Sequence, residues 1–324
     1  MPNLSTDRPL IIASRGSALA LTQSHHVKDR FQALVPDLEV KIQIFKTEGD
    51  NLQSKAPHEI PDKLPKGLFT KELERALLEN EADLAVHSLK DLPTVLPDGL
   101  KLAAVSPRED VREVLLTKEP LEFPPTQENP LAALKDGARI GTGSPRRQAF
   151  LHLAKASLQS EGIRGNVATR IRKLAEQESL DGIILAAAGL RRLGYHLEDG
   201  KLLSGEDLPD SIFATILPIS AMVPSVGQAA LGLETRSDDP RVQGFCDQFN
   251  DSETQLCVEV ERAFLEAMGG GCLAPVAAVA TIREGVLKLV AANVADQQFR
   301  LETVETAPEN GVSLARELAD KLRN

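Results

Sequence analysis

The alternation of apolar and polar positions divides the chain into short buried strands and amphipathic helices. Continuous apolar runs bounded by polar or glycine-rich turns are typical of strands buried in a sheet. The segment 253–268 instead carries Leu256, Val260, Phe264 and Ala267 at helical spacing, which predicts a helix. The strands expected from this pattern lie at 10–13, 40–45, 84–86, 139–141, 181–188, 276–282, 286–293 and 298–305. The expected helices lie at 18–31, 66–80, 239–250, 253–268 and from about 312 onward.

Two strand–turn–helix units in different halves of the chain repeat the same design. Strand 10–13 is followed by Ser14-Arg15-Gly16-Ser17 and a helix, and strand 139–141 by Thr142-Gly143-Ser144-Pro145 and another helix. Ser17 and Ser144 are well placed as helix N-caps. The backbone N–H groups at such a helix start bind anions, although an ordinary turn with a solvated Arg15 is an equally good interpretation of the first unit. The repeat predicts two similar open-sheet domains that face a shared cleft.

A second group of polar residues follows the strand expected at 84–86. Ligands of open α/β sheets lie beyond the carboxyl ends of the strands, which is where Lys90 and Asp91 stand. A salt bridge within a loop is the alternative explanation for this pair. The segment 46–67 is rich in Pro, Gly, Asp and Lys, and is expected to be a long mobile loop of the kind that forms lids.

Composition narrows the class of protein. The 324 residues carry a net charge of −10, and only 3% are aromatic, which disfavours nucleic acid and anionic membranes as partners. No apolar run is long enough to span a membrane. The first eight residues lack a secretory pattern, so a cytoplasmic protein is expected. The acidic total hides one basic region: residues 139–192 hold eight Arg and two Lys against four acids, a net charge of +6. Arginines gathered in this way favour carboxylate or phosphate ligands.

The three cysteines form neither a disulfide framework nor a metal motif, and no metal is expected. Cys246 and Cys257 fall on apolar helix faces and are expected in the core. Cys272 differs because it follows Gly269-Gly270-Gly271 and precedes Pro275, which predicts a loop that exposes its thiol to chemistry. A small residue in a tight turn is the other interpretation.

Together these segments resemble the porphobilinogen deaminase family over essentially the whole chain. The resemblance rests on the order and spacing of several motifs. These are Ser14-Arg15-Gly16-Ser17, Lys66-Gly67-Leu68-Phe69, 83–93, 141–148, Arg164-Gly165-Asn166, the Ala-Gly-Leu-Arg-Arg-Leu-Gly run at 188–194 and the glycine–cysteine loop. Gly143 and Pro145 stand where the family often has Ser and Leu, and Ala229 replaces a frequent Gly, so differences are expected in local turn geometry.

The resemblance implies a three-domain α/β fold. Two periplasmic-binding-protein-like open mixed sheets around a cleft are joined by a small α+β C-terminal domain with a three-stranded antiparallel sheet. Domain 1 is expected at 1–108 and 213–234, domain 2 at 109–212 and domain 3 at 235–324.

The resemblance also implies a chemistry. Cys272 would hold a dipyrromethane cofactor through a thioether, and four molecules of porphobilinogen would be condensed onto it with loss of ammonia before hydroxymethylbilane is released. Asp91 matches the catalytic carboxylate of the family. The residues that match binders of the acetate and propionate groups are Arg15, Ser17, Lys66, Lys71, Lys90, Thr142, Ser144, Arg146, Arg147, Arg164, Arg170 and Arg192. A monomer is expected, with no nucleic-acid partner.

Two other functions compete with this interpretation. A non-catalytic binding protein for a carboxylate or phosphate would explain the arginines but not the glycine-flanked Cys272. A cysteine-nucleophile hydrolase or acyltransferase would need a histidine partner, and His87 is the one histidine near a plausible site.

Overall fold

The computed structural model describes residues 6–53, 67–123, 128–198, 201–202, 205, 212–270, 275–295 and 299–323. The chain forms two compact units, each made of two stretches of sequence. Met1–Arg108 and Ala230–Leu256 make the first unit, and Glu109–Ala229 and Cys257–Asn324 make the second. Within the described residues, no helix has the length and apolar character needed to cross a membrane.

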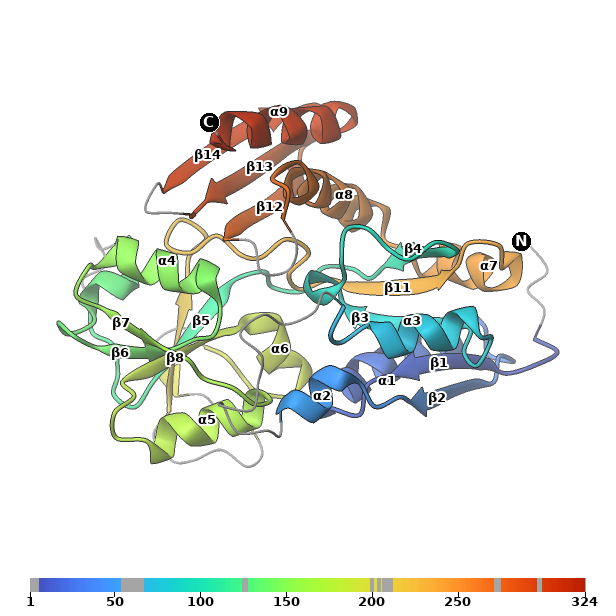
Figure 1. Ribbon diagram of the computed structural model, residues 1–324, viewed down its shortest axis with the longest axis horizontal. Coiled ribbons are helices and arrows are strands. Elements are labelled where there is room, and N and C mark those ends of the chain that lie inside the picture. Colours follow the sequence, from blue (N-terminus) through green and yellow to red (C-terminus); the bar gives the residue numbers. More distant parts are fainter. Residues whose placement is uncertain are drawn as a thin grey trace. The chain divides into compact units, whose positions relative to one another are not determined.

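The first unit is built on a mixed sheet whose strand order is β2-β1-β3-β11-β4 in the described part of the chain (Figure 1). β1, β2 and β3 run parallel, and β11 runs antiparallel to both β3 and β4. The strands are β1 (Leu10–Ser14), β2 (Val40–Ile44), β3 (Leu84–Ser88), β4 (Leu100–Val105) and β11 (Leu231–Arg236). The helices are α1 (Ala18–Leu34), α2 (Glu48–Gln53), α3 (Lys71–Leu78) and α7 (Pro240–Phe249).

Alternation along the strands of the first sheet supplies a core on each face. Leu10 and Ile12 of β1 pack in one cluster with residues of α1 and α7. Ala13, one position further along β1, packs in another cluster with residues of α3. Because successive side chains of a strand point to opposite faces, these two clusters place α1 and α7 on one face of the sheet and α3 on the other.

The second unit contains a sheet of six described strands in the order β7-β6-β8-β5-β10-β9. β6 is parallel to β7 and β8, whereas β5 is antiparallel to β8 and β10. The strands are β5 (Glu113–Thr117), β6 (Arg139–Gly141), β7 (Gln159–Glu161), β8 (Gly182–Ala186), β9 (Lys201–Leu202) and β10 (Phe213–Leu217). The helices are α4 (Pro145–Ala154), α5 (Val167–Glu176) and α6 (Ala187–Arg192).

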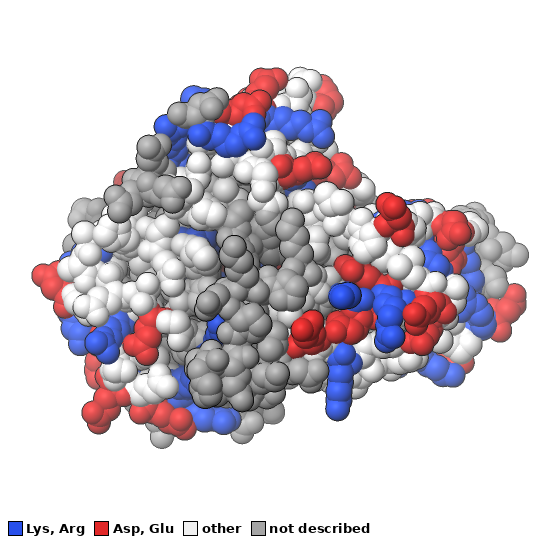
Figure 2. Space-filling model, in the orientation of Figure 1, with Lys and Arg blue, Asp and Glu red and all other residues white. Residues whose placement is uncertain are grey.

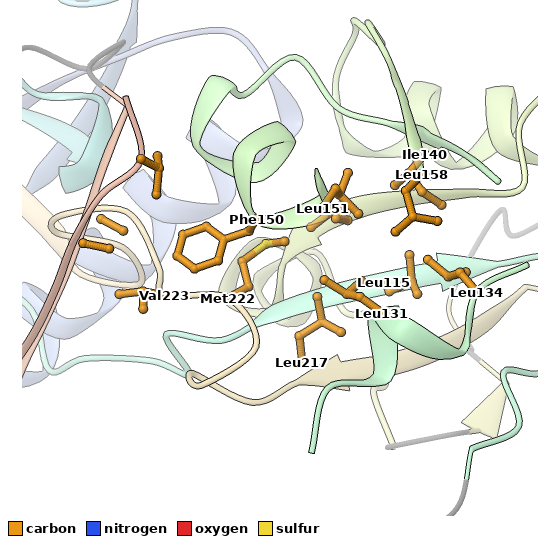
Figure 3. Close-up of a cluster of buried hydrophobic side chains, with 14 of the residues drawn as sticks. Leu115, Leu131, Leu134, Ile140, Phe150, Leu151, Leu158, Leu217, Met222 and Val223 are labelled. Carbon is orange, nitrogen blue, oxygen red and sulfur yellow. The ribbon is translucent and has the colours of Figure 1, made fainter. Parts of the chain in front are cut away.

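The core of this second sheet is also double. One cluster, drawn in Figure 3, joins Leu115 and Ile140 of the sheet to Phe150 of α4 and to residues of β12 and β13. The other joins Val114 and Leu116 to residues of α5 and α6. Phe150 also meets Phe299 edge to face, with ring centroids 5.3 Å apart. These contacts bury both faces of β5, which accounts for the consecutive apolar residues Val114-Leu115-Leu116 within it.

An antiparallel meander completes the second unit (Figure 1). Its strands are β12 (Val276–Arg283), β13 (Val286–Asn293) and β14 (Arg300–Thr306), accompanied by α8 (Ser252–Ala267) and α9 (Gly311–Arg323). Val260 and Phe264 of α8 and Leu318 of α9 are buried with residues of β12 and β13. The two open mixed sheets and the three-stranded antiparallel sheet confirm the expected fold class.

Several expected elements differ from the structure. Residues 48–53, expected within a long loop, form α2, which is favoured by Glu48 and Asp50 in its first turn. The run 181–188 leaves the sheet after Ala186 and becomes α6, because consecutive alanines favour a helix. In these two places the sequence expectation was wrong.

Two expected domain boundaries also differ. β10 was expected in the first domain, but it pairs with β5 in the second sheet, where its apolar side chains are buried. α7 was expected in the third domain, but its apolar stripe packs on the first sheet, where Phe245 and Phe249 contact Phe31. The strand β11 does return to the first sheet, as expected.

Candidate active site

The first group of site residues lies at one edge of the first sheet. β1 and β3 are parallel neighbours, with Ile12 opposite Leu84 and Ala13 opposite Ala85. Residues that follow these two strands therefore emerge at the same edge, which is the edge where open α/β sheets bind ligands. Arg15 follows β1, and Lys90 and Asp91 follow β3.

Asp91 is carried by a single turn of 3₁₀ helix that is anchored at its start. This turn, Leu89–Asp91, begins with the buried side chain of Leu89. The backbone N–H of Leu89 donates to the carbonyl of Ala230 at 3.0 Å, and the N–H of Leu92 closes the turn on the carbonyl of Leu89 at 3.1 Å. The Asp91 side chain is exposed and that of Lys90 is half-buried. The carboxylate is thus exposed on a turn that is fixed through its backbone.

Polar contacts tie α1 to the strands that carry these residues. The amide Nε2 of Gln23 donates to the hydroxyl of Ser88, the last residue of β3, at 2.7 Å. The hydroxyl of Ser24 donates to that of Ser14, the last residue of β1, at 2.8 Å. Sequence reasoning missed Gln23, whose partner lies 65 positions away, and no local signal marks it.

Three of the expected binding residues lie at or beside the ends of helices and strands: Arg15, Ser17 and Lys71. Ser17 caps α1 as expected, accepting from the backbone N–H of Ala20 at 3.4 Å. Arg15 precedes this cap and pairs with Asp50, which the sequence reasoning also missed. Lys71 is the exposed first residue of α3. Lys66 lies outside the described residues.

A second group lies at the corresponding edge of the second sheet. β6 is parallel to both β7 and β8, so residues after these three strands share one edge. After β6, Thr142 is buried and accepts from the N–H of Ser144 at 3.2 Å, and Ser144 caps α4 as expected. After β7, Arg164 is exposed. Arg170, near the start of α5, directs Nε to the carbonyl of Gly165 at 2.7 Å.

Arg146 and Arg147 are buried in the second unit and share an acid that the sequence reasoning missed. Glu113, the fully buried first residue of β5, accepts from Nη2 of Arg146, and from Nη2 of Arg147 at 2.8 Å. Nη1 of Arg146 donates to the carbonyl of Val223 at 2.6 Å, and Nη1 of Arg147 to that of Ile184 at 2.7 Å. A carboxylate ligand reaching either guanidinium would therefore share it with Glu113.

The burial of Arg146 and Arg147 changes how the positive charge of residues 139–192 is interpreted. Burial lowers the pKa of Arg146, although Glu113 acts in the opposite direction. Part of the positive charge of 139–192 is therefore internal, and Glu113 partly balances it. On the outer surface, basic and acidic side chains are interspersed over the described parts of the face in Figure 2. A sequence signal for Glu113 did exist, because it is an acid directly before the apolar run Val114-Leu115-Leu116.

Arg192, at the end of α6, is also largely withdrawn from solvent. Its Nη2 donates to the carbonyl of Ala229 at 2.6 Å. Burial lowers the pKa of Arg192 to about 10, and the nearby Glu109 only partly offsets this effect. The guanidinium still carries its charge at neutral pH, and a desolvated cation gains more from an anionic ligand than a solvated one does.

Two of the three cysteines lie in the core, as the sequence predicts. Cys246 is fully buried, and burial raises its thiol pKa to about 12; Cys257 is buried too. Both expected core positions are confirmed. Cys272 lies outside the described residues. His87 is buried and its Nε2 lies 2.8 Å from Oε2 of Glu234, so it is already engaged within the core of the first unit. This placement disfavours His87 as the partner of a nucleophilic cysteine.

Comparison with known proteins identifies the family. Residues 10–244 match the family model described as "Porphobilinogen deaminase, dipyromethane cofactor binding domain". Residues 255–324 match "Porphobilinogen deaminase, C-terminal domain". This chain belongs to the porphobilinogen deaminase family. The first match spans Arg15, Asp91 and Arg192, and the second spans Cys272.

Curated relatives of the family match over nearly their whole length. The porphobilinogen deaminase of Syntrophomonas wolfei is 40% identical over 317 residues, which cover 97% of this chain and 95% of the relative. That of Syntrophus aciditrophicus is 41% identical over 313 residues, covering 96% and 94%. Among solved structures, an OxyR mutant of Corynebacterium glutamicum is similar with a TM-score of 0.44 and 17% identity, covering 83% of this chain and 71% of that one. So loose a likeness carries no conclusion about function.

Proposed function

We propose that this protein is a hydroxymethylbilane synthase, a transferase of tetrapyrrole biosynthesis. It condenses four porphobilinogen molecules stepwise onto a covalently bound dipyrromethane, releases one ammonia at each step, and finally hydrolyses the product from the cofactor. The observation that carries this proposal is membership of the porphobilinogen deaminase family, with 40% identity to a curated relative over 97% of the chain. A non-catalytic binding protein is not favoured, because the curated relatives cited above are named as deaminases.

Asp91 is assigned the acid–base role. In each condensation the C–N bond of an aminomethyl group breaks, and a new C–C bond forms at the free carbon of a pyrrole, which then loses its proton. The acid form of Asp91 can protonate the departing amine, and the carboxylate form can stabilise the cationic pyrrole that the departure leaves. Its exposure at the edge of the first sheet, on an anchored turn, supports this assignment.

The basic residues are assigned to the carboxylates of substrate and cofactor. Each pyrrole unit carries one acetate and one propionate, and guanidinium groups bind such carboxylates with two parallel hydrogen bonds. Arg15 and Lys90 follow strands of the first sheet, and Arg164 follows a strand of the second. The desolvated Arg192 would hold an anionic group most strongly. The full set proposed is Arg15, Ser17, Lys66, Lys71, Lys90, Thr142, Ser144, Arg146, Arg147, Arg164, Arg170 and Arg192.

Dipyrromethane fits the donor set of this chain, because its acetates and propionates match the exposed Arg164 and the half-buried Arg15 and Lys90. Cys272 is proposed as its attachment point, since Cys246 and Cys257 are buried. When bound, the group supplies the pyrrole carbon onto which the first substrate is added. We further place the enzyme in the cytoplasm as a monomer.

The test compares three purified proteins: wild type, Asp91→Asn and Cys272→Ser. Intact mass after denaturation should exceed the sequence mass by one dipyrromethane in wild type, and should equal the sequence mass in Cys272→Ser. Asp91→Asn removes both the charge and the proton, so its turnover of porphobilinogen should be slower by at least about 100-fold. The Asp91→Asn protein should nevertheless unfold at an unchanged temperature.

Each part of the proposal has an outcome that contradicts it. An active wild-type preparation without added mass would remove Cys272 from the cofactor's attachment. A stable Asp91→Asn protein with normal turnover would remove Asp91 from catalysis. A lower unfolding temperature with normal turnover would instead indicate a structural ion pair with Lys90.

A further inference from the structure

In the first unit, the start of α2 is docked on the segment that precedes α3. The backbone N–H of Gly49 donates to the carbonyl of Leu68 at 3.0 Å. A side chain at Gly49 would place its Cβ 2.2 Å from two ring carbons of Phe69, so only glycine permits this approach. The N–H of Glu48 donates to Oε1 of Glu72 at 2.8 Å. The hydrogen bonds of the Glu48 and Gly49 backbone N–H groups therefore set the position of Asp50, the residue that follows them in α2.

Asp50 holds the guanidinium of Arg15 by one edge. Nε of Arg15 lies 3.2 Å from Oδ1 and 3.4 Å from Oδ2 of Asp50, and Nη2 lies 2.5 Å from Oδ1. The guanidinium carbon lies 4.2 Å from the centroid of the Phe69 ring. Arg15 is thus held on two sides, by a carboxylate along its Nε–Nη2 edge and by an aromatic face against its plane.

The carboxylate of Asp50 is itself fixed. The hydroxyl of Thr47, whose side chain is buried, donates to Oδ2 of Asp50 at 2.8 Å, and the backbone N–H of Asp50 donates back to that hydroxyl at 3.2 Å. Burial alone raises the pKa of Asp50, but the hydrogen bonds from Arg15 and Thr47 lower it below its usual value. Asp50 is therefore ionised at neutral pH and pairs with Arg15 as a charged group.

The geometry leaves a defined direction for a ligand. The contacts with Asp50 use Nε and Nη2, so the opposite edge of the fork, formed by Nη1 and Nη2, is not the edge that Asp50 occupies. That edge can make two parallel bonds with a carboxylate. An arginine side chain loses rotamer entropy when it is held by a ligand, and holding it in advance removes much of that cost from binding.

We propose that Asp50 is a positioning residue for substrate recognition. It fixes Arg15 on the ring of Phe69 so that the Nη1–Nη2 edge receives a carboxylate of porphobilinogen. The inference rests on the proposed role of Arg15 as a carboxylate ligand, and extends it by naming the acid that orients it. An internal carboxylate could instead compete with the substrate for Arg15, and the two roles predict opposite changes in KM.

The experiment measures kcat and KM for porphobilinogen in wild type, Asp50→Asn and Asp50→Glu. Asn keeps the size but loses the charge and replaces one accepting oxygen with an NH2 group that cannot accept, so KM should rise about tenfold while kcat changes less than about threefold. Asp50→Glu should recover part of the loss, because the charge is retained. The cofactor content of each protein is checked by intact mass, so that only holoenzyme is compared.

A matched control uses another aspartate of the same unit. Asp239 accepts from Nη2 of Arg236 at 2.7 Å, and its side chain is 14% exposed, against 25% for that of Asp50. Arg236 ends β11, which runs antiparallel to β3, and so lies at the opposite edge of the sheet. Asn at 239 can still cap α7, and Asp239→Asn should leave KM unchanged. Should Asp50→Asn fail to fold, Thr47→Val removes the hydroxyl that fixes the carboxylate and should raise KM about threefold.

Arg15→Leu separates failure of this inference from failure of the proposed function. A raised KM in Arg15→Leu and in Asp50→Asn supports the inference. If Arg15→Leu raises KM but Asp50→Asn leaves it unchanged, or lowers it as a competitor would, the inference is overturned and the role of Arg15 stands. If neither variant changes KM, Arg15 is not a substrate ligand and both statements fall, while the assignment of Asp91 is unaffected.

Discussion

Ala229 adopts a left-handed backbone conformation, with φ at 74°, although it carries a side chain and is buried. This conformation costs an L-residue about 1–2 kcal/mol. The carbonyl of Ala229 accepts from Nη2 of Arg192 at 2.6 Å and from the N–H of Glu109 at 3.2 Å. The strained peptide therefore presents an acceptor that a relaxed backbone would direct elsewhere, beside a proposed ligand of the substrate.

Replacing Ala229 with glycine should stabilise the protein. Glycine relieves the left-handed strain but loses more entropy on folding, by about 0.5–1 kcal/mol, so a net gain of about 0.5–1 kcal/mol is expected. The free energy of unfolding, measured in urea for Ala229→Gly and for wild type, gives this gain. Ala149→Gly, in the middle of α4, is the control of opposite sign and should lose about 1 kcal/mol. A loss of stability in Ala229→Gly would mean that the contacts of the methyl group outweigh the strain.

At the scale of single residues, the sequence predicts contacts between residues that are close together in the chain. Ser17 and Ser144 were identifiable as caps because each accepts from a backbone N–H three residues away. The partner of Arg15 was not identifiable, because Asp50 lies 35 positions away and meets it only after α2 has docked. The strain at Ala229 falls where the residue departs from the family's frequent glycine, so an unusual residue did mark that turn.

Among the elements, β5 and α4 are joined by the group of Glu113, Arg146 and Arg147. Two cations and one anion are buried here, and each guanidinium also donates to a backbone carbonyl. Breaking a buried ion pair from one side leaves an uncompensated charge in a medium that solvates it poorly. The group therefore links the strand and the helix only while all three members are present.

Glu113→Gln should destabilise the protein by about 3–5 kcal/mol, because two buried guanidiniums would then share a neutral amide. The matched control is Glu109→Gln, whose acid pairs with Arg191 at 3.1 Å with more than a third of each side chain exposed. Exposed pairs contribute about 0–1 kcal/mol, so this variant should be nearly neutral. Equal urea midpoints for the two variants would contradict the buried network. Loss of activity in Arg146 or Arg147 variants must accordingly be judged beside their stability.

Helices and strands were predicted correctly where the sequence followed a single periodicity, either alternating or helical. The strands of the meander and the terminal helix match the expected positions closely, because alternating and helical periodicities are strong there. α6 was missed because an apolar alanine run after β8 fits a buried strand as well as a helix. β10 was assigned to the wrong sheet, since its partner β5 is about a hundred residues earlier and strand pairing leaves no mark in the sequence of one strand.

At the level of the whole chain, the repeated strand–turn–helix design predicted which of the proposed site residues follow parallel strands of the same sheet. Parallel strands bring their following residues to one edge, and this holds separately in each sheet for Arg15 with Asp91 and for Thr142 with Arg164. The acids that pair with the arginines, Glu113 and Asp50, could not be predicted in this way. The charge counted along a sequence does not distinguish a buried ion pair from a ligand site.

The pH dependence of folding should combine two opposing groups of carboxyls. The pKa values of Asp50, Asp110 and Asp239 are lower than the usual 3.8: burial raises each, but hydrogen bonds from arginines and backbone N–H groups outweigh it. The pKa of Glu74 is higher than its usual 4.5, because it is buried and faces Glu234 and Glu72, with His87 acting in the opposite direction. The aspartates thus favour the folded state when ionised, and Glu74 when protonated.

The signs follow from linkage. The contribution of the aspartates is complete above their unfolded pKa and is lost as pH falls through the lower folded value, so Tm should drop as pH goes from about 5 to about 2. Asp239→Asn should make this drop smaller.

The contribution of Glu74 is complete below its unfolded pKa and is lost as pH rises through the higher folded value. Glu74→Gln should therefore raise Tm at pH 7 relative to pH 4, compared with wild type. Calorimetric scans from about pH 2 to about pH 8 measure both variants. Parallel Tm curves for wild type and both variants would show that these carboxyls have the same pKa in the folded and unfolded chain.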